Sequence, residues 1–136
     1  MIKPIMKSEF FLRLPSEDAG PDDAATGQDL LDTLNEHEHE CVGLAANMIG
    51  VRKRIICVKD VTRALLMYNP QILEQVNAYQ TSEGCLSLAG ERPCTRYRRI
   101  KVEYLDENFV RRIKNFSGYT AEIIQHEIDH CQGIVI

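Results

Sequence analysis

The chain has 136 residues, of which 44% are hydrophobic and 26% are charged, proportions typical of one globular domain rather than a disordered or collagen-like chain. Its net charge of −4 argues against a general affinity for nucleic acid or an anionic membrane surface. No apolar run is long enough to cross a bilayer, and Lys3, Pro4 and Lys7 interrupt the amino-terminal stretch, which therefore lacks the apolar segment of a secretory signal. We expect a single domain over residues 1–136, located in the cytoplasm.

The five cysteines are an odd number and include no Cys-x-x-Cys pair. Without an export signal, such a set is typical of reduced and mostly buried thiols, one of which can take part in chemistry. The stretch 92–114 is rich in basic side chains and could face RNA, but the pattern favours a solvated strand face.

A helix is the first element that the sequence predicts. Asp22 or Asp23 can cap it, and it runs to about His39. Its buried side consists of three leucines: Leu30, Leu31 and Leu34. A segment of small residues, 43–50, follows before the first strands.

Apolar runs and alternation predict the strands. Residues 55–58 and 65–68 are short apolar runs, and Asn69-Pro70 is expected to end the second. Residues 99–104 alternate between charged and apolar side chains, as a half-buried strand requires. A turn at 106–108 leads into a partner strand over 109–116, so the pair is expected to form an antiparallel hairpin.

A carboxy-terminal helix opens at Ser117 or Gly118 and is closed by Gly133. His126 and His130 are four residues apart on it, so both imidazoles project from one face and can grip one divalent ion. A separate apolar stripe would anchor the helix to the core: Ala121, Ile124, Ile128 and Cys131. The expected fold is α+β, with mostly antiparallel sheets packed around this metal-binding helix and another helix near the amino terminus.

The histidine pair belongs to an HExxH pattern, which is short and can also arise on a solvated helix surface. Glu127 lies beside the pair on the helical wheel and can reach a water next to the ion without ligating the ion itself. The string 36–41 offers a similar spacing between His37 and Cys41, but its many charges favour a solvated helix end.

A catalytic metal needs a third protein ligand and an open position. The candidate is Cys85 within Glu83-Gly84-Cys85-Leu86-Ser87, where Gly84 permits close backbone approach and a thiolate suits a borderline-soft ion. A lone cysteine is more often a small buried hydrophobe, so the choice depends on the histidine pair.

Three segments, in this order, resemble the signature motifs of peptide deformylases. They are Gly43-Leu44-Ala45-Ala46-Asn47-Met48-Ile49-Gly50, Glu83-Gly84-Cys85-Leu86-Ser87 and Gln125-His126-Glu127-Ile128-Asp129-His130. The resemblance runs from about Cys41 to the end and is faint over residues 1–40. It implies an α+β metalloenzyme that removes the formyl group from N-formylmethionyl peptides and nascent bacterial proteins, with transient contact to the ribosome and no nucleic-acid specificity of its own.

The resemblance also implies roles for individual residues. One divalent ion, Fe²⁺ in most cases and Zn²⁺ or Ni²⁺ as alternatives, is held by three side chains: Cys85, His126 and His130. Glu127 is then the general acid–base, and the backbone N–H of Leu86 donates to the developing oxyanion. Two residues match positions that support the site from behind: Arg92 and Asp129. Three residues line the substrate side: Val42, Gly43 and Ile123.

The chain departs from the family pattern at two positions. Met48 stands where the family has a glutamine whose amide donates to the oxyanion, and a thioether cannot donate. Loss of one such donor costs about 10²–10³ in turnover, so we expect reduced activity rather than none. Asn47 carries an amide one position earlier, but an extended segment would turn it to the other side. Cys41 replaces a further glycine, and the chain ends soon after the metal helix, so a short and divergent member is expected.

Three functions are consistent with the sequence. A metal-dependent deformylase ranks first. A deformylase-like protein that binds metal and peptides without turnover ranks second, because of Met48. A zinc peptidase, inferred from the HExxH pattern alone, ranks third because it leaves Cys85 without a role.

Overall fold

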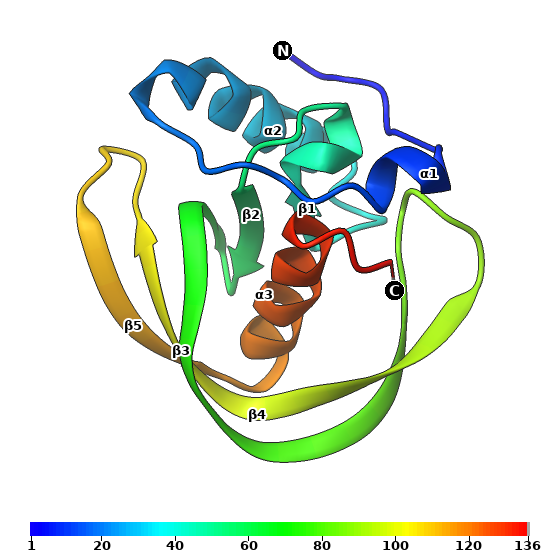
Figure 1. Ribbon diagram of the computed structural model, residues 1–136, viewed down its shortest axis with the longest axis vertical. Coiled ribbons are helices and arrows are strands. Elements are labelled where there is room, and N and C mark those ends of the chain that lie inside the picture. Colours follow the sequence, from blue (N-terminus) through cyan, green and yellow to red (C-terminus); the bar gives the residue numbers. More distant parts are fainter. Residues whose placement is uncertain (136) are drawn as a thin grey trace.

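The computed structural model describes residues 1–135 and contains a five-stranded antiparallel sheet that curves around one helix (Figure 1). Each strand pairs with the next one along the chain, in the order β1-β2-β3-β4-β5. The strands are β1 (Gly43–Ala45), β2 (Ile55–Asp60), β3 (Arg63–Gly84), β4 (Glu91–Leu105) and β5 (Arg111–Ser117). The expected α+β class and the antiparallel hairpin of β4 and β5 are confirmed.

Three α-helices accompany the sheet, together with two short 3-10 helices at Pro21–Asp23 and Ala46–Ile49. The α-helices are α1 (Glu9–Leu12), α2 (Ala24–Glu36) and α3 (Gly118–Cys131). The predicted first helix therefore begins close to where we expected but ends three residues early. The N–H of His37 closes the last turn on the carbonyls of Thr33 and Leu34, and the charged residues beyond it form turns instead of a buried helical face.

Helix α3 lies inside the curve of the long β3–β4 pair, with β1 and β2 along its side (Figure 1). Its predicted apolar stripe is confirmed, because all four side chains are buried: Ala121, Ile124, Ile128 and Cys131. Gly118 and Gly133 both have positive φ, 62° and 77°, which explains why glycines open and close this helix. The core around α3 thus fixes its orientation along the sheet.

The expectation that Asn69-Pro70 ends a strand is wrong. Strand β3 continues for another 14 residues, and the register with β4 shifts between Tyr68 and Gln71. Asn69 adopts a left-handed conformation, with φ 52°, and its amide exchanges two hydrogen bonds with the backbone of Ala19. The bulge accommodates the proline within the strand, and β3 carries on to the residues next to Cys85.

All five cysteines are free, as expected, but the prediction that most of them are buried is wrong, because only Cys57 and Cys131 are. The basic stretch forms an exposed strand face for the most part, with pairs such as Arg111 to Glu103 at 2.8 Å. Arg96 is the exception, since it is buried. Within residues 1–135, no helix has the length and apolar character to span a membrane.

Candidate metal centre and active site

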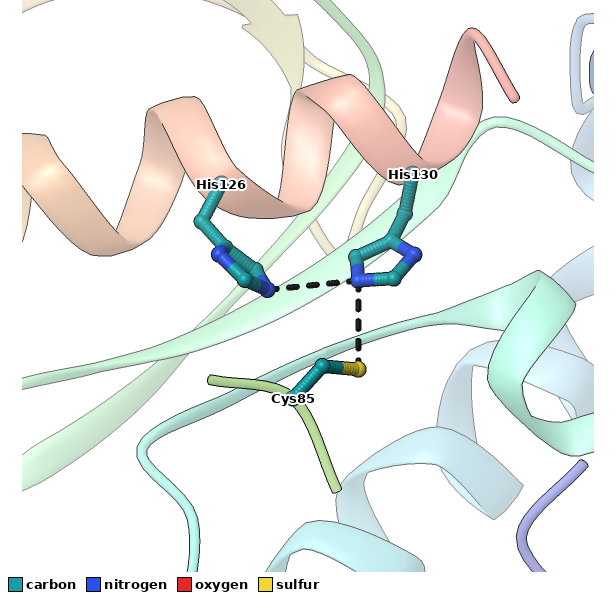
Figure 2. Close-up of side chains that lie close together, drawn as sticks. All are labelled: Cys85, His126 and His130. Atoms are coloured by element: carbon teal, nitrogen blue, oxygen red, sulfur yellow. Dashed lines mark hydrogen bonds between the residues drawn. The ribbon is translucent and has the colours of Figure 1, made fainter. Parts of the chain in front are cut away.

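Cys85, His126 and His130 converge, as Figure 2 shows. The two imidazoles leave the same face of α3, and Cys85 approaches them from the bend that follows β3. The two Nε2 atoms are 3.2 Å apart, and the Cys85 sulfur is 3.4 Å from Nε2 of His130. All three candidate ligand atoms lie within 4.8 Å of one another, and they form the one such group found in the described part of the chain.

This arrangement fits a divalent cation. Ligand atoms about 2.0–2.3 Å from a tetrahedral ion lie roughly 3.3–3.7 Å from one another, close to the spacings seen here. One thiolate and two imidazoles form a donor set that suits iron, zinc or nickel. The Nδ1 atom of His126 donates to Glu83 Oε1 at 2.9 Å, so its Nε2 atom is the one presented to the ion.

Glu83 links the histidine to a buried arginine. Arg96 on β4 donates to Glu83 through Nη2 at 2.7 Å and to Asp129 on α3 through Nη1 at 2.7 Å. Burial raises the pKa of Glu83, but hydrogen bonds from His126 and Arg96 outweigh it, so the pKa lies well below its usual range. The resulting carboxylate holds the His126 ring in place and ties two strands to α3.

The backbone of α3 at His130 is held by a residue from another element, Asn47. The side-chain amide of Asn47 donates to the carbonyl oxygen of His130 at 2.9 Å. Burial, followed by the nearby His126, lowers the pKa of His130 to about 3, so its ring is neutral and can act as a ligand. The expectation for Asn47 was wrong in its premise: residues 46–49 form a 3-10 helix rather than an extended segment.

Glu127 lies next to the cluster, and the residue is only 4% exposed. Its Oε1 atom is buried and has no hydrogen-bond partner in residues 1–135. Burial raises the pKa of Glu127 to about 7, which suits a group that accepts and returns a proton near neutral pH. A buried carboxylate oxygen without a partner indicates that a water or substrate atom completes this site.

A cavity of about 670 Å³ opens beside Glu127. The predicted substrate residues Val42, Gly43 and Ile123 all line it, together with Leu86 and Met48. Gly43 packs directly against the active side of α3, because an added Cβ there would lie 2.7 Å from Ile123 Cγ2 and 2.9 Å from Glu127 Oε2. A glycine is therefore required at this contact.

Met48 is almost completely buried, and its sulfur accepts a hydrogen bond from the Ala45 N–H at 3.5 Å. The side chain lines the cavity but offers it no hydrogen-bond donor. The fold thus places Met48 at the edge of the site.

The sequence matches the family model described as polypeptide deformylase over residues 7–136. The chain belongs to the peptide deformylase family. A peptide deformylase from Clostridium beijerinckii is 50% identical over 136 residues, which is all of both chains, and peptide deformylase 1 from Clostridium perfringens is 37% identical over 111 residues, 79% of this chain and 74% of that one. The match to the family begins well before Cys41, so the resemblance over residues 1–40 is stronger than we expected.

Solved deformylases have the same fold. The actinonin-bound class I type b peptide deformylase from Acinetobacter baumannii superimposes with a TM-score of 0.88 at 30% identity, over 99% of this chain and 95% of that chain. The peptide deformylase from Thermus thermophilus gives 0.86 at 33% identity, over 99% and 83%. Because the chain belongs to this family, the third hypothesis, a zinc peptidase inferred from the HExxH pattern alone, is excluded.

Of the two supporting residues expected from the sequence, Arg92 and Asp129, only Asp129 lies behind the histidines. Arg92 is not among the groups behind the histidines, since its guanidinium reaches Glu9 on the surface at 3.4 Å. Arg96 occupies that place together with Asp129. Alternation along β4 could not have identified Arg96, because Arg98 has the same parity as Arg96, Ile100 and Val102 and is exposed.

Proposed function

We propose that this protein removes the formyl group from N-formylmethionyl peptides in a metal-dependent hydrolysis. The observation that carries the proposal is the convergence of Cys85, His126 and His130 beside a buried carboxylate oxygen of Glu127 that has no hydrogen-bond partner among residues 1–135. A divalent ion held by the three ligands would polarise the formyl group and lower the pKa of water at the site. The products are formate and a peptide with a free amino-terminal methionine.

In this proposal Glu127 moves the proton. Its carboxylate accepts a proton from the water that attacks the formyl carbon, and then delivers that proton to the leaving amine nitrogen. Burial supports this role, because it brings the pKa of Glu127 to about 7, between those of an ordinary carboxylate and an amine. Glu83 fixes the orientation of the His126 ring, and Arg96 in turn holds Glu83 in place.

We assign the Leu86 N–H as a donor to the developing oxyanion. Leu86 follows Cys85 directly in the bend after β3 and lines the cavity. Met48 provides no second donor, so turnover is expected to be lower than in a protein with glutamine there. The apolar side chains of Val42 and Ile123, with the open surface of Gly43, form the wall proposed to receive the methionine side chain.

The family resemblance favours Fe²⁺ as the native ion, and Zn²⁺ or Ni²⁺ suits the same sulfur and nitrogen donors. Metal analysis of protein prepared without oxygen tests this assignment. Because the substrate is a nascent peptide, we propose that the protein acts in the cytoplasm and meets the ribosome transiently.

The test is formate release from formyl-Met-Ala-Ser by anaerobically iron-loaded protein. The Acinetobacter baumannii enzyme has been solved with Met-Ala-Ser bound, which is the unformylated form of this peptide. Glu127→Gln should keep the metal and the fold but lose turnover by at least about a hundredfold, since general acid–base catalysis contributes about 10²–10⁴. Full activity in that variant, or in metal-free protein, would contradict the proposal.

Met48 favours one alternative, a deformylase-like protein that binds metal and amino-terminal peptides without hydrolysis. Its buried sulfur can only accept, as the contact from Ala45 shows. Measurable affinity for the formylated peptide with no formate release, even in Met48→Gln, would support this alternative over the enzyme.

A further inference from the structure

The cavity beside Glu127 is strongly acidic. Eighteen of the residues that the structure describes line it. Six of these carry carboxylates, and none is a lysine or an arginine. The six are Glu38, Glu40, Glu83, Glu91, Glu122 and Glu127. The proposed function uses only two of them, so the other four have no role yet.

The carboxylates fall into an inner and an outer group. Glu83 is buried and paired with Arg96, while Glu122 is half-buried and accepts a hydrogen bond from the Tyr79 hydroxyl at 3.3 Å. The outer group, here called the acidic rim, consists of Glu38, Glu40 and Glu91, and all three are exposed. Two of these belong to the 36–41 string, whose many charges favour a solvated helix end.

The acidic rim is not neutralised by lysine or arginine. Glu38 and Glu40 have histidine neighbours, at 3.5 Å from His39 and 3.1 Å from His37, and Glu91 has no ion pair within residues 1–135. Two lysines come near, but they donate to backbone carbonyls and do not line the cavity: Lys59 to Glu38 at 3.4 Å and Lys7 to Leu86 at 2.7 Å. The rim therefore retains a negative potential toward the opening.

In the proposed function, the reacting end of the ligand is bound next to Glu127, which lines the same cavity. There the buried Oε1 atom of Glu127 has no partner in the described structure. A formyl group is at one end of its peptide, so the rest of the peptide has to leave through the opening. An extended peptide advances about 3.3–3.6 Å per residue, so the residues that follow the methionine pass the acidic rim.

We propose that this acidic rim makes the site selective for N-formylmethionyl peptides that carry lysine or arginine in the positions after methionine, over peptides with aspartate or glutamate there. The inference rests on the proposed function and names the substrates within it. Opposite charge attracts such a peptide and like charge repels its acidic counterpart, without any contact to the reacting atoms. The selectivity therefore belongs mainly to KM rather than to kcat.

The experiment compares three peptides with the metal-loaded protein: formyl-Met-Ala-Lys-Lys, formyl-Met-Ala-Ser-Ser and formyl-Met-Ala-Glu-Glu. We expect kcat/KM to be about tenfold higher for the lysine peptide than for the glutamate peptide at low ionic strength, as two exposed charge pairs allow. Salt at about 0.5 M shortens the electrostatic screening length to about 4 Å, so the lysine-to-glutamate ratio of kcat/KM should then fall toward one.

A double variant tests the residues. Glu38→Gln with Glu40→Gln should reduce the lysine-to-glutamate ratio of kcat/KM about threefold or more. The matched control is Asp22→Asn with Glu107→Gln, which changes the net charge equally at exposed positions away from the cavity and should preserve the ratio. Calorimetric binding of the unformylated Met-Ala-Lys-Lys and Met-Ala-Glu-Glu to the unaltered protein should show the same preference.

The outcomes separate the two proposals. Equal kcat/KM for the three peptides would overturn the selectivity and leave the deformylase function standing, as would an equal loss of selectivity in the control variant. Absence of formate release from all three peptides would overturn the proposed function and this inference with it.

Discussion

Met48 and Gly43 are the two single residues of the cavity whose side chains bear most directly on the proposed catalysis, and they do so in opposite ways. Met48 is buried at the cavity edge and can only accept a hydrogen bond, which it takes from Ala45. Gly43 has no side chain, and this lets the first strand touch Glu127 and Ile123 directly. Met48 therefore offers the cavity no hydrogen-bond donor, whereas Gly43 preserves a contact that a larger residue would break.

Replacing Met48 with glutamine should raise kcat by about tenfold or more. The glutamine oxygen can accept from the Ala45 N–H as the sulfur does now, which leaves the amide nitrogen free to donate into the cavity. Met48→Leu is the matched control, with similar bulk and no donor, and should not gain activity. Formate release measures the effect, and an unchanged or lower kcat in Met48→Gln would contradict the oxyanion argument.

Replacing Gly43 with alanine should lower kcat by about a hundredfold while metal content stays the same. The new Cβ would lie 2.9 Å from Glu127 Oε2, so the carboxylate must shift, and a misplacement of about 1 Å costs roughly that much. Gly20→Ala is the control, because nothing lies within 4 Å of its Cβ. A Gly43→Ala variant with normal kcat would show that Glu127 can move without loss.

At the scale of elements, the site depends on how β3, β4 and α3 are joined. Arg96 from β4 lies between Glu83 at the end of β3 and Asp129 on α3, and its side chain is 5% exposed. Glu83 in turn holds His126. One buried arginine therefore transmits the position of two strands to a proposed metal ligand.

Arg96→Gln should reduce the free energy of unfolding by about 3 kcal/mol, because it removes the charged partner of the buried Glu83 carboxylate and of the half-buried Asp129 carboxylate. The affinity for metal should also fall about tenfold or more, since the orientation of His126 is no longer fixed. Urea denaturation and a metal competition assay measure the two effects. Arg92→Gln is the control, as its contact to Glu9 lies on the surface, and equal losses in both variants would refute the assignment of Arg96.

For the whole molecule, the three proposed ligands connect distant parts of the chain. Cys85 comes from the bend after β3, and the histidines come from α3, which packs against β1, β2 and β4. An ion bound by all three therefore joins the long β3–β4 pair to the central helix. Binding to the folded state alone stabilises that state by mass action.

Removing the metal with a chelator should lower Tm by roughly 10 °C. An ion present at about a thousand times its Kd contributes about 4 kcal/mol to the folded state, and each kcal/mol corresponds to a few degrees in a chain of this size. Thermal unfolding with and without chelator measures this. Cys85→Ala should lose most of the metal-dependent shift, and a Tm that does not respond to metal in the unaltered protein would contradict the three-ligand site.

Several features of the fold could be predicted because they are local. Helical spacing identified the histidine pair and the apolar stripe of α3, and alternation identified the inward face of β4. The end of β3 could not be predicted in this way. Asn69-Pro70 resembles a strand terminator, but contacts between Asn69 and Ala19, fifty residues earlier, turn it into a bulge.

The sequence by itself determined the family, the pairing of His126 with His130 and the choice of Cys85, because motif spacing and helix geometry are properties of neighbouring residues. Only the tertiary structure decided that Arg96 rather than Arg92 lies behind the site, that Asn47 binds the His130 carbonyl, and that the acidic 36–41 string borders the cavity. Those contacts join residues far apart in the chain, and burial, which gives each of them its electrostatic strength, arises only when the elements pack together.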